Sequence, residues 1–283
     1  MKNKKLLVLD IDGTLVNSSK EITPGVRHAI YEMLEQGHQL CLASGRPTPG
    51  IRHVASQLEL NKRGGLALNF NGALVTDLTT GEVVFERKLA HHFVEELYNF
   101  ACEKDLGILT YARDIGRTGE YPKSEAPYVI FGRRTDPYLE DEANLNDLPW
   151  YISEDFVKEL DYEPYKILFT MDPARGESLE NELAERYKGV LSIMRSEPYF
   201  LEACPLGIDK GNCLDMLTPI LGFKREDVIC CGDGFNDLTM IKWAGLGVAM
   251  GNAQQEVKAV ADYIAATNDE DGVAKVIRQF ILW

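Results

Sequence analysis

The sequence predicts an α/β protein whose core is interrupted by a second, α+β domain. Near the start of the chain, short apolar runs alternate with helical periodicity, as in a doubly wound parallel sheet. This alternation becomes irregular at about residue 85 and resumes at about residue 206. With 283 residues, 45% of them hydrophobic, the chain is long enough for two buried cores. We therefore predict a discontinuous, Rossmann-like core at 1–84 and 206–283 and an inserted α+β domain at 85–205.

The first core segment begins with four apolar residues in a row, typical of a strand buried on both faces. The helix that follows has Thr23 as its N-cap and Pro24 at its first position, and Gly37 ends it. A hairpin that turns near Thr80 and Gly81 closes the segment. In order, we expect strand Leu6–Leu9, a helix from Pro24, strand Gln39–Ala43, a helix through Leu58, strand Leu66–Phe70, and hairpin strands Ala73–Thr76 and Val83–Arg87.

In the inserted segment, helices and strands alternate less regularly, and proline-containing turns separate several of them. This pattern indicates helices packed on a largely antiparallel sheet. The acidic run Glu140-Asp141-Glu142 is expected to form a solvated face. The expected helices are Phe93–Cys102 and Leu179–Tyr187, and the expected strands are Ile108–Tyr111, Tyr128–Phe131, Lys166–Met171, Leu191–Arg195 and Tyr199–Ala203.

The doubly wound pattern returns after Gly207, and the loop before the next helix contains Lys210. A fourth buried core strand then ends in a Gly-Asp-Gly sequence. The expected elements are helix Asn212–Leu221, strand Asp227–Cys231, helix Leu238–Trp243, strand Leu246–Met250, helix Gln254–Val260 and helix Asp271–Phe280.

Composition narrows the classes of partner. A formal charge of −14 argues against general nucleic-acid binding, although a local cation can still attract a small phosphorylated substrate. No apolar run approaches the roughly 20 residues of a membrane-spanning helix, and the N-terminal stretch lacks a signal-peptide cleavage site. The six cysteines include no C-x-x-C pair and are typical of buried, reduced thiols. We expect a cytoplasmic protein, a monomer or weak homodimer, without a nucleic-acid or membrane partner.

Two carboxylates follow the first strand. Asp10 and Asp12 leave the sheet on the same side because they are two residues apart in an extended segment, and Gly13 permits a sharp turn. Ligands bind at the carboxyl ends of strands in open α/β sheets, so a cation is one explanation of the pair. Loop solvation or helix capping is the alternative. A calcium loop starting at Asp10 is excluded, because Leu15 occupies the position that requires glycine.

Other strand ends supply partners for this pair. Carboxylates with Mg²⁺ form a hard-oxygen site, a lysine and a hydroxyl can bind phosphoryl oxygens, and a carboxylate can attack phosphorus. Hydrolysis of a phosphate monoester needs both a nucleophile and charge neutralisation. The residues expected to meet at this edge of the sheet are Asp10, Asp12, Ser44, Lys210, Asp233, Asn236 and Asp237.

These motifs resemble those of the haloacid dehalogenase superfamily phosphatases, specifically the Cof-type branch with a large α+β cap. The resemblance covers essentially the whole chain and therefore implies that residues 85–205 are a cap that sets substrate specificity. The matching segments are Asp10-Ile11-Asp12-Gly13-Thr14, Ser44-Gly45-Arg46, Asn71-Gly72-Ala73, Lys210-Gly211 and Gly232-Asp233-Gly234-Phe235-Asn236-Asp237.

The resemblance implies a role for each residue. Asp10 would be the nucleophile, and Asp12 would protonate the leaving group and then activate water. Mg²⁺ would be bound by Asp10, Asp233 and the backbone carbonyl of Asp12. Phosphate would be bound by Ser44, Gly45, Asn71 and Lys210, with Asn236, Asp237 and Arg46 as supporting residues. Turn formation at Asn71 and loop bracing by Arg46 are the structural alternatives.

The resemblance also narrows the reaction. Dehalogenases lack the second aspartate, which is present here as Asp12, and P-type ATPases need membrane helices. Hydrolysis of a small phosphorylated metabolite is preferred, with phosphotransfer or phosphomutase activity on hexose phosphates, or non-catalytic ligand binding, as alternatives. Sugar phosphates, nucleotides and cofactor phosphates all stay open as substrates. We interpret His91-His92 as a solvated helix start and Arg113, Arg117, Arg133 and Arg134 as surface charge, with leaving-group binding as the alternative for the arginines.

Overall fold

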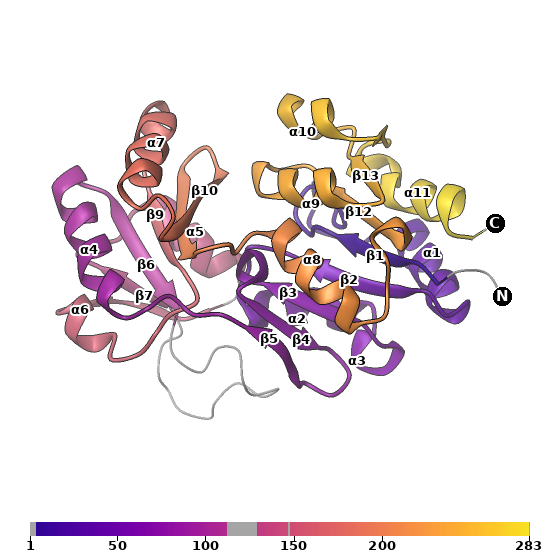
Figure 1. The fold of residues 1–283 in the computed structure, drawn as a ribbon, viewed down its shortest axis with the longest axis horizontal. Helices are drawn as coiled ribbons and strands as arrows, with labels where there is room; N and C mark the ends of the chain where they lie inside the picture. Colours follow the sequence, from indigo (N-terminus) through magenta and orange to yellow (C-terminus); the bar gives the residue numbers. More distant parts are fainter. Residues whose placement is uncertain (1–3, 112–128, 147, 283) are drawn as a thin grey trace. The chain divides into compact units, whose positions relative to one another are not determined.

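The computed structural model describes residues 4–111, 129–146 and 148–282, which form two compact units (Figure 1). One unit comprises Met1–Gly45, Ile51–Val84 and Asp209–Trp283, and the other Arg46–Gly50 and Phe85–Ile208. The first contains a mainly parallel sheet and the second a separate sheet, so the predicted α/β class with an inserted α+β region is confirmed.

Eight strands form the sheet of the first unit. β1 lies in its interior, parallel to β12 on one side and to β2 on the other. The antiparallel strand β4 follows β3 at one end. In spatial order the strands are β14 (Tyr263–Ile264), β13 (Leu246–Ala249), β12 (Val228–Gly232), β1 (Leu6–Leu9), β2 (Gln39–Ala43), β3 (Leu66–Asn69), β4 (Leu74–Asp77) and β5 (Val83–Glu86).

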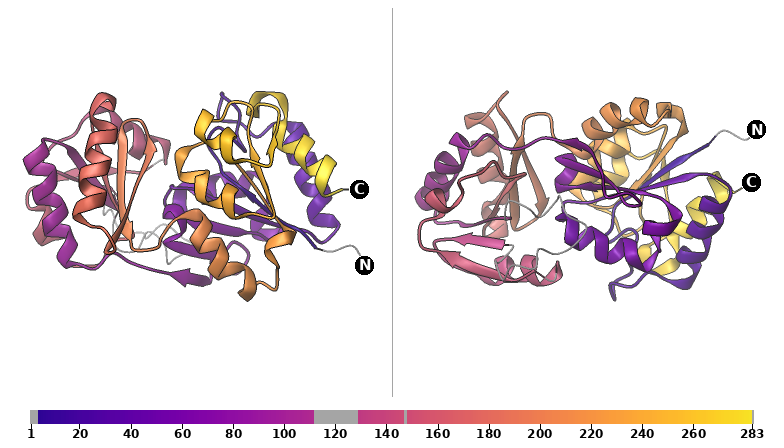
Figure 2. Two further views of the ribbon diagram at one scale, coloured as in Figure 1. Left: turned by 45° about the horizontal axis from the view of Figure 1, so that its top comes forward. Right: turned by 90° about the horizontal axis from the view of Figure 1, so that it is seen from below.

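Helices cover both faces of this sheet (Figure 2). Side chains alternate along a strand, so Leu7 and Leu9 share a face, and both belong to one buried cluster with Ile30 and Ile277. α8 and α9 pack together on the opposite face (Figures 1 and 2). The helices are α1 (Pro24–Glu35), α2 (Thr48–Gln57), α3 (Leu60–Arg63), α8 (Lys210–Ile220), α9 (Leu238–Trp243), α10 (Gln255–Val260) and α11 (Gly272–Phe280).

The second unit contains a six-stranded sheet in which β7 and β8 are parallel and the other pairs antiparallel. One face is covered by an apolar cluster that includes Phe100, Ile108, Phe169 and Leu183. The strand order is β10 (Leu191–Glu197), β11 (Phe200–Pro205), β9 (Ile167–Thr170), β6 (Gly107–Tyr111), β7 (Val129–Gly132) and β8 (Trp150–Ser153), and the helices are α4 (His92–Lys104), α5 (Pro137–Leu145), α6 (Phe156–Glu159) and α7 (Gly176–Arg186).

Three sequence predictions were wrong in part. The run Glu140-Asp141-Glu142 is not wholly solvated, because the Glu142 side chain is buried within hydrogen-bonding reach of Tyr111. Lys210 is the first residue of α8 and does not lie in the preceding loop. Cys102 is exposed, although the other five cysteines are buried and all six are free thiols as expected.

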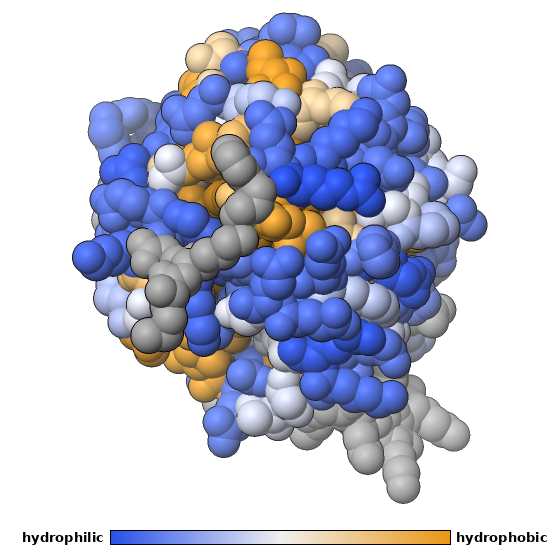
Figure 3. All heavy atoms as spheres, turned by 90° about the vertical axis from the view of Figure 1, so that its right-hand side faces the viewer, coloured by the Kyte–Doolittle hydropathy of each residue, from blue (hydrophilic) through white to orange (hydrophobic). Residues whose placement is uncertain are grey.

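The surface agrees with the charged composition. On the face shown in Figure 3, hydrophilic side chains cover most of the area and apolar ones gather in smaller patches. Within the described residues, no helix combines the length and hydropathy required to cross a membrane. His91 and His92 are exposed at the start of α4, as predicted.

Candidate active site

Asp10 lies at the carboxyl end of β1, and its backbone N–H extends the pairing with β12 by donating to the carbonyl oxygen of Cys231 at 3.0 Å. Its carboxylate is buried, and Oδ1 accepts a hydrogen bond from Lys210 Nζ at 2.7 Å. Burial raises the pKa of Asp10 well above its usual range, and the Lys210 ammonium opposes that shift, while Asp237 and Asp233 add to it. An ionised Asp10 therefore depends on positive charge close to it.

Lys210 supplies part of that charge. Asp209 caps α8 by accepting from Asn212 N at 2.9 Å, and this cap places Lys210 in the first turn. The ammonium is fully buried, 2.7 Å from Asp10 Oδ1 and 2.6 Å from Asp237 Oδ1. Burial alone would lower the pKa of Lys210, but the two carboxylates more than offset it and raise the pKa above its usual value. The two carboxylates therefore favour the charged form of Lys210.

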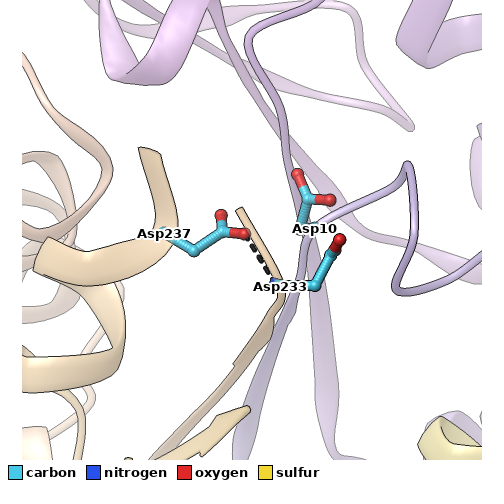
Figure 4. A group of neighbouring side chains, drawn as sticks. All are labelled: Asp10, Asp233 and Asp237. Atoms are coloured by element: carbon cyan, nitrogen blue, oxygen red, sulfur yellow. Dashed lines mark hydrogen bonds between the residues drawn. The ribbon is translucent and has the colours of Figure 1, made fainter. Parts of the chain in front are cut away.

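Asp233 and Asp237 follow β12 in a loop and in a short 3₁₀ helix, Phe235–Asp237. Figure 4 shows their carboxylates converging with that of Asp10. Asp237 Oδ2 accepts the backbone N–H groups of Asp233 at 2.9 Å and of Gly234 at 3.0 Å. A Cβ at Gly232 would lie 2.5 Å from the Asp237 side chain, so only glycine leaves room for this carboxylate. Asp237 is thus held by Lys210 and by the loop itself.

The turn after Asp12 contacts Asp233 directly. Gly13 has φ +77°, and a Cβ there would lie 2.2 Å from Asp233 Oδ2. This close approach lets Thr14 Oγ1 donate to Asp233 Oδ1 at 2.7 Å. The opposite side of the turn is held by Asn252, whose Nδ2 donates to the Gly13 carbonyl oxygen at 2.8 Å. The sharp turn expected from the sequence explains why position 13 is a glycine. No sequence pattern indicated the contact of Asn252 with this turn.

The donor set fits a hard divalent cation. Oxygen atoms of Asp10, Asp233 and Asp237 lie within 4.8 Å of one another. Both Asp237 oxygens already accept hydrogen bonds, so Asp10 and Asp233 are the better placed carboxylate ligands. The Asp12 side chain is not part of this group, and its Oδ1 instead lies 2.7 Å from Lys20 Nζ. The prediction that only the backbone of Asp12 faces the metal is compatible with this position.

The other predicted phosphate-binding residues lie at the neighbouring strand ends. Ser44 follows β2; its N–H donates to Leu68 O at 2.9 Å, and its carbonyl oxygen accepts from Asn71 N at 3.0 Å. Asn71 is fully buried with φ +55°, and its Oδ1 accepts from Asn236 Nδ2 at 3.0 Å. Gly45 is half-buried beside Ser44. Hydrogen bonds therefore join Ser44, Asn71 and Asn236, from the end of β2 to the segment after β12.

The predicted arginines are divided. Arg46 is buried and belongs by its contacts to the second unit. Arg133 and Arg134 are exposed, and both lie near Asp105, which agrees with the interpretation as surface charge. Arg113 and Arg117 lie outside the described residues.

Comparison with known proteins places this geometry in a family. The family model described as haloacid dehalogenase-like hydrolase matches residues 7–277. The chain belongs to the haloacid dehalogenase-like hydrolases. It is 33% identical over 281 residues to the 5-amino-6-(5-phospho-D-ribitylamino)uracil phosphatase YcsE of Bacillus subtilis, covering 98% of this chain and 96% of that protein. Family and relatives together identify the enzyme as a phosphatase of this superfamily.

Solved structures of the family have the same fold. A haloacid dehalogenase-like hydrolase from Bacteroides thetaiotaomicron is 43% identical, with a TM-score of 0.83 over 98% of this chain and 99% of that chain. The subclass IIB sugar phosphatase BT4131 has a TM-score of 0.81 over 99% and 100% of the two chains. At 24% identity, this second likeness supports only the shared fold.

Sequence reasoning missed three contacts of the site: those of Lys20 with Asp12, of Thr14 with Asp233 and of Asn252 with Gly13. Thr14 lies in the first motif, so its position there was a usable signal. Lys20 and Asn252 lie outside the sequence motifs that were matched to phosphate chemistry. Only the folded loops bring them to the first motif.

Proposed function

We propose that this phosphatase is Mg²⁺-dependent and hydrolyses small phosphorylated metabolites through an aspartyl-phosphate on Asp10. The observation that carries the proposal is the position of Lys210, whose buried ammonium binds Asp10 and Asp237 together. A buried carboxylate with a raised pKa needs such a cation to stay ionised and nucleophilic. Asp233, within reach of the same centre, completes a site for a dianionic phosphoryl group with its metal.

In the first step, a carboxylate oxygen of Asp10 attacks phosphorus as the bond from phosphorus to the leaving oxygen breaks. Asp12 gives its proton to that oxygen, so the alcohol leaves neutral. In the second step, Asp12 takes a proton from water while the water oxygen attacks phosphorus, which releases inorganic phosphate and restores Asp10. Lys210 and the hydroxyl of Ser44 would bind phosphoryl oxygens through both steps.

Mg²⁺ would be held by Asp10, Asp233 and the Asp12 backbone carbonyl and, when bound, would supply charge neutralisation for the phosphoryl group. The residues of the chain do the rest. Lys210 favours the ionised form of Asp10, and Asp237 holds Lys210 through an oxygen that lies 2.6 Å from its ammonium. The resulting arrangement is electrostatically preorganised before the substrate binds.

The substrate class is supported by the relatives. The B. subtilis relative is named for a phosphorylated ribitylamino-uracil, a small metabolite that carries one phosphate monoester. We extend to this chain the class of small phosphorylated metabolites, which includes sugar phosphates, nucleotides and cofactor phosphates. The inserted region at 85–205 would set the choice among them, and the protein would act in the cytoplasm.

The test is release of phosphate from p-nitrophenyl phosphate by the wild type, by Asp10→Asn and by a matched control, Asp227→Asn, which removes a partly buried carboxylate that pairs with Lys5 away from the Asp10 cluster. We expect turnover that EDTA abolishes and Mg²⁺ restores, a loss of roughly 10⁴-fold in Asp10→Asn, and no loss in the control. Denaturation during turnover should trap phosphate on the wild type and on the control, but not on Asp10→Asn. Full activity of Asp10→Asn would exclude Asp10 as nucleophile, and exchange of phosphate between sugar positions with little free phosphate would instead indicate a phosphomutase.

A further inference from the structure

The segment after the first motif forms a tight turn that contains an unusual lysine. The N–H of Asn17 donates to Glu21 O and that of Lys20 to Asn17 O, both at 2.9 Å. Asn17 Oδ1 also accepts the N–H groups of Ser19 and Glu21, at 3.0 and 2.9 Å. Lys20 itself has φ +61°, a left-handed conformation that costs free energy in a residue with a side chain. The turn therefore holds Lys20 in a conformation that a glycine or asparagine would adopt more easily.

This turn is anchored to the C-terminal part of the first unit. Ser18 donates from its N–H and from Oγ to the two oxygens of Asp269, at 2.8 and 2.7 Å. Asn268 Nδ2 donates to the carbonyl oxygen of Val16 at 2.9 Å. The hollow between these segments has a volume of about 380 Å³, and its lining includes Lys20 and Gly13. The backbone that carries Lys20 is thus fixed on both sides.

From this fixed turn, the Lys20 ammonium reaches back to 2.7 Å from Asp12 Oδ1. The Lys20 side chain is 56% exposed and that of Asp12 29%, so the pair is solvated and contributes little to stability. Neither the ion pair nor the strained φ is explained by stabilisation of the fold. Both are explained if the contact serves the reaction at Asp12.

We infer that Lys20 is a positioning residue that orients the Asp12 carboxyl group for proton transfer to the leaving group. The inference rests on the proposed role of Asp12. Proton transfer requires the acid within hydrogen-bonding distance of the leaving oxygen, so an Asp12 side chain in another orientation would lose part of its effect. Lys20 contacts Asp12 and acts through it.

The experiment compares kcat/KM for p-nitrophenyl phosphate and phenyl phosphate in the wild type, Lys20→Met, Lys20→Arg and Asp12→Asn. This parameter reports the step in which the leaving group departs, and phenolate needs a proton far more than p-nitrophenolate does. We expect Lys20→Met to lose about tenfold with phenyl phosphate and less than about threefold with p-nitrophenyl phosphate. Lys20→Arg should recover most of the loss, and Asp12→Asn should show the same substrate pattern with larger losses.

The matched control is Lys5→Met, which breaks a partly exposed ion pair of 3.0 Å with Asp227 on the same unit. This substitution should leave kcat/KM unchanged for both substrates. Equal losses on both substrates, a rise in KM alone, or no loss in Lys20→Met would each overturn the inference. If Asp12→Asn itself fails to discriminate between the two substrates, the proposed role of Asp12 fails, and the inference with it. Full activity of Asp10→Asn would instead contradict the proposed function as a whole.

Discussion

Among the residues that the structure describes, two buried lysines pair with carboxylates, one in each unit, and the surroundings of the two pairs differ. Lys210 is completely buried between Asp10 and Asp237. Lys166, just before β9, is 1% exposed and lies 3.1 Å from Glu202 on β11. In both cases burial would lower the pKa of the lysine, and neighbouring carboxylates reverse that effect and raise it.

The difference lies in the balance of charge. Around Lys210, the carboxylates of Asp10, Asp233 and Asp237 converge, so one ammonium faces three anions. Around Lys166, Glu202 is the direct partner, and the second acid, Glu142, accepts a hydrogen bond from Tyr111. A buried ion pair alone is therefore weak evidence for a site. Three carboxylates whose oxygens converge within 4.8 Å beside one ammonium are what indicates a cation at the first cluster.

The largest expected effect separates the two lysines. Lys210→Met should abolish phosphatase activity, by about 10³-fold or more, because Asp10 loses its buried counter-charge. Lys210→Met and Lys166→Met should each destabilise the protein by about 3–5 kcal/mol, because either substitution leaves a carboxylate buried without its cation. Lys166→Met should nevertheless keep activity within about threefold of the wild type under folding conditions. Urea unfolding and phosphate release measure the two quantities separately.

Loss of activity in Lys166→Met below its unfolding transition would contradict the comparison. It would place the Lys166 cluster in substrate binding and not only in the structure of the second unit.

A smaller effect tests how tightly the first cluster is packed. Gly13→Ala places a methyl group 2.2 Å from Asp233 Oδ2 in a backbone with φ +77°, so kcat/KM should fall about 10–100-fold. Gly81→Ala is the matched control, because Gly81 has φ +75° with no atom within 4 Å of the added Cβ. The control should lose stability by about 1 kcal/mol and keep its activity. Equal activity losses in both variants would show that strain, and not contact with Asp233, is responsible.

The smallest effect concerns pH and the second cluster. Burial raises the pKa of Glu142 above its ordinary value of 4.5, and Lys166 opposes this only in part. A carboxyl whose folded pKa is raised stabilises the fold fully below pH 4.5 and loses that contribution as pH rises through the folded pKa. Glu142→Gln should therefore raise Tm at pH 7 by about 2–4 °C, with the gain vanishing near pH 4. A gain that grows toward acid pH would reverse the assigned shift.

The core was predictable because each of its strands is a local signal. Leu6–Leu9 and Val228–Gly232 are apolar at every position up to the terminal glycine of the second, and they are buried as that pattern indicates. The second unit was predicted less completely. α6 has only four residues, Phe156–Glu159, which is too short for helical periodicity, and β8 carries mixed residues because it is only half-buried. Short elements and half-buried strands give only a weak hydrophobic pattern in the sequence.

The site divides in the same way. Asp10 and Asp233 follow strands and Lys210 begins a helix, so the sheet topology alone could bring them together. Glu142 was misjudged because its partner, Tyr111, is 31 residues away and its burial depends on that contact. Lys20 lies in a turn and has a left-handed backbone conformation, and from there its ammonium reaches Asp12. A lysine in a sequence gives no sign that it will adopt this conformation.

The position of β1 between β2 and β12 has a consequence for biosynthesis. A nascent chain that has exposed only its first half already contains β1 and β2, but the strand that completes the other edge of β1 is made more than 200 residues later. Until then, the edge of the apolar strand β1 is open to pairing with other chains, and Asp10 lacks the Lys210 ammonium as its partner. The ion pair of Asp10 with Lys210 and the protection of this strand edge therefore form at the same stage, when the last third of the polypeptide leaves the ribosome and docks.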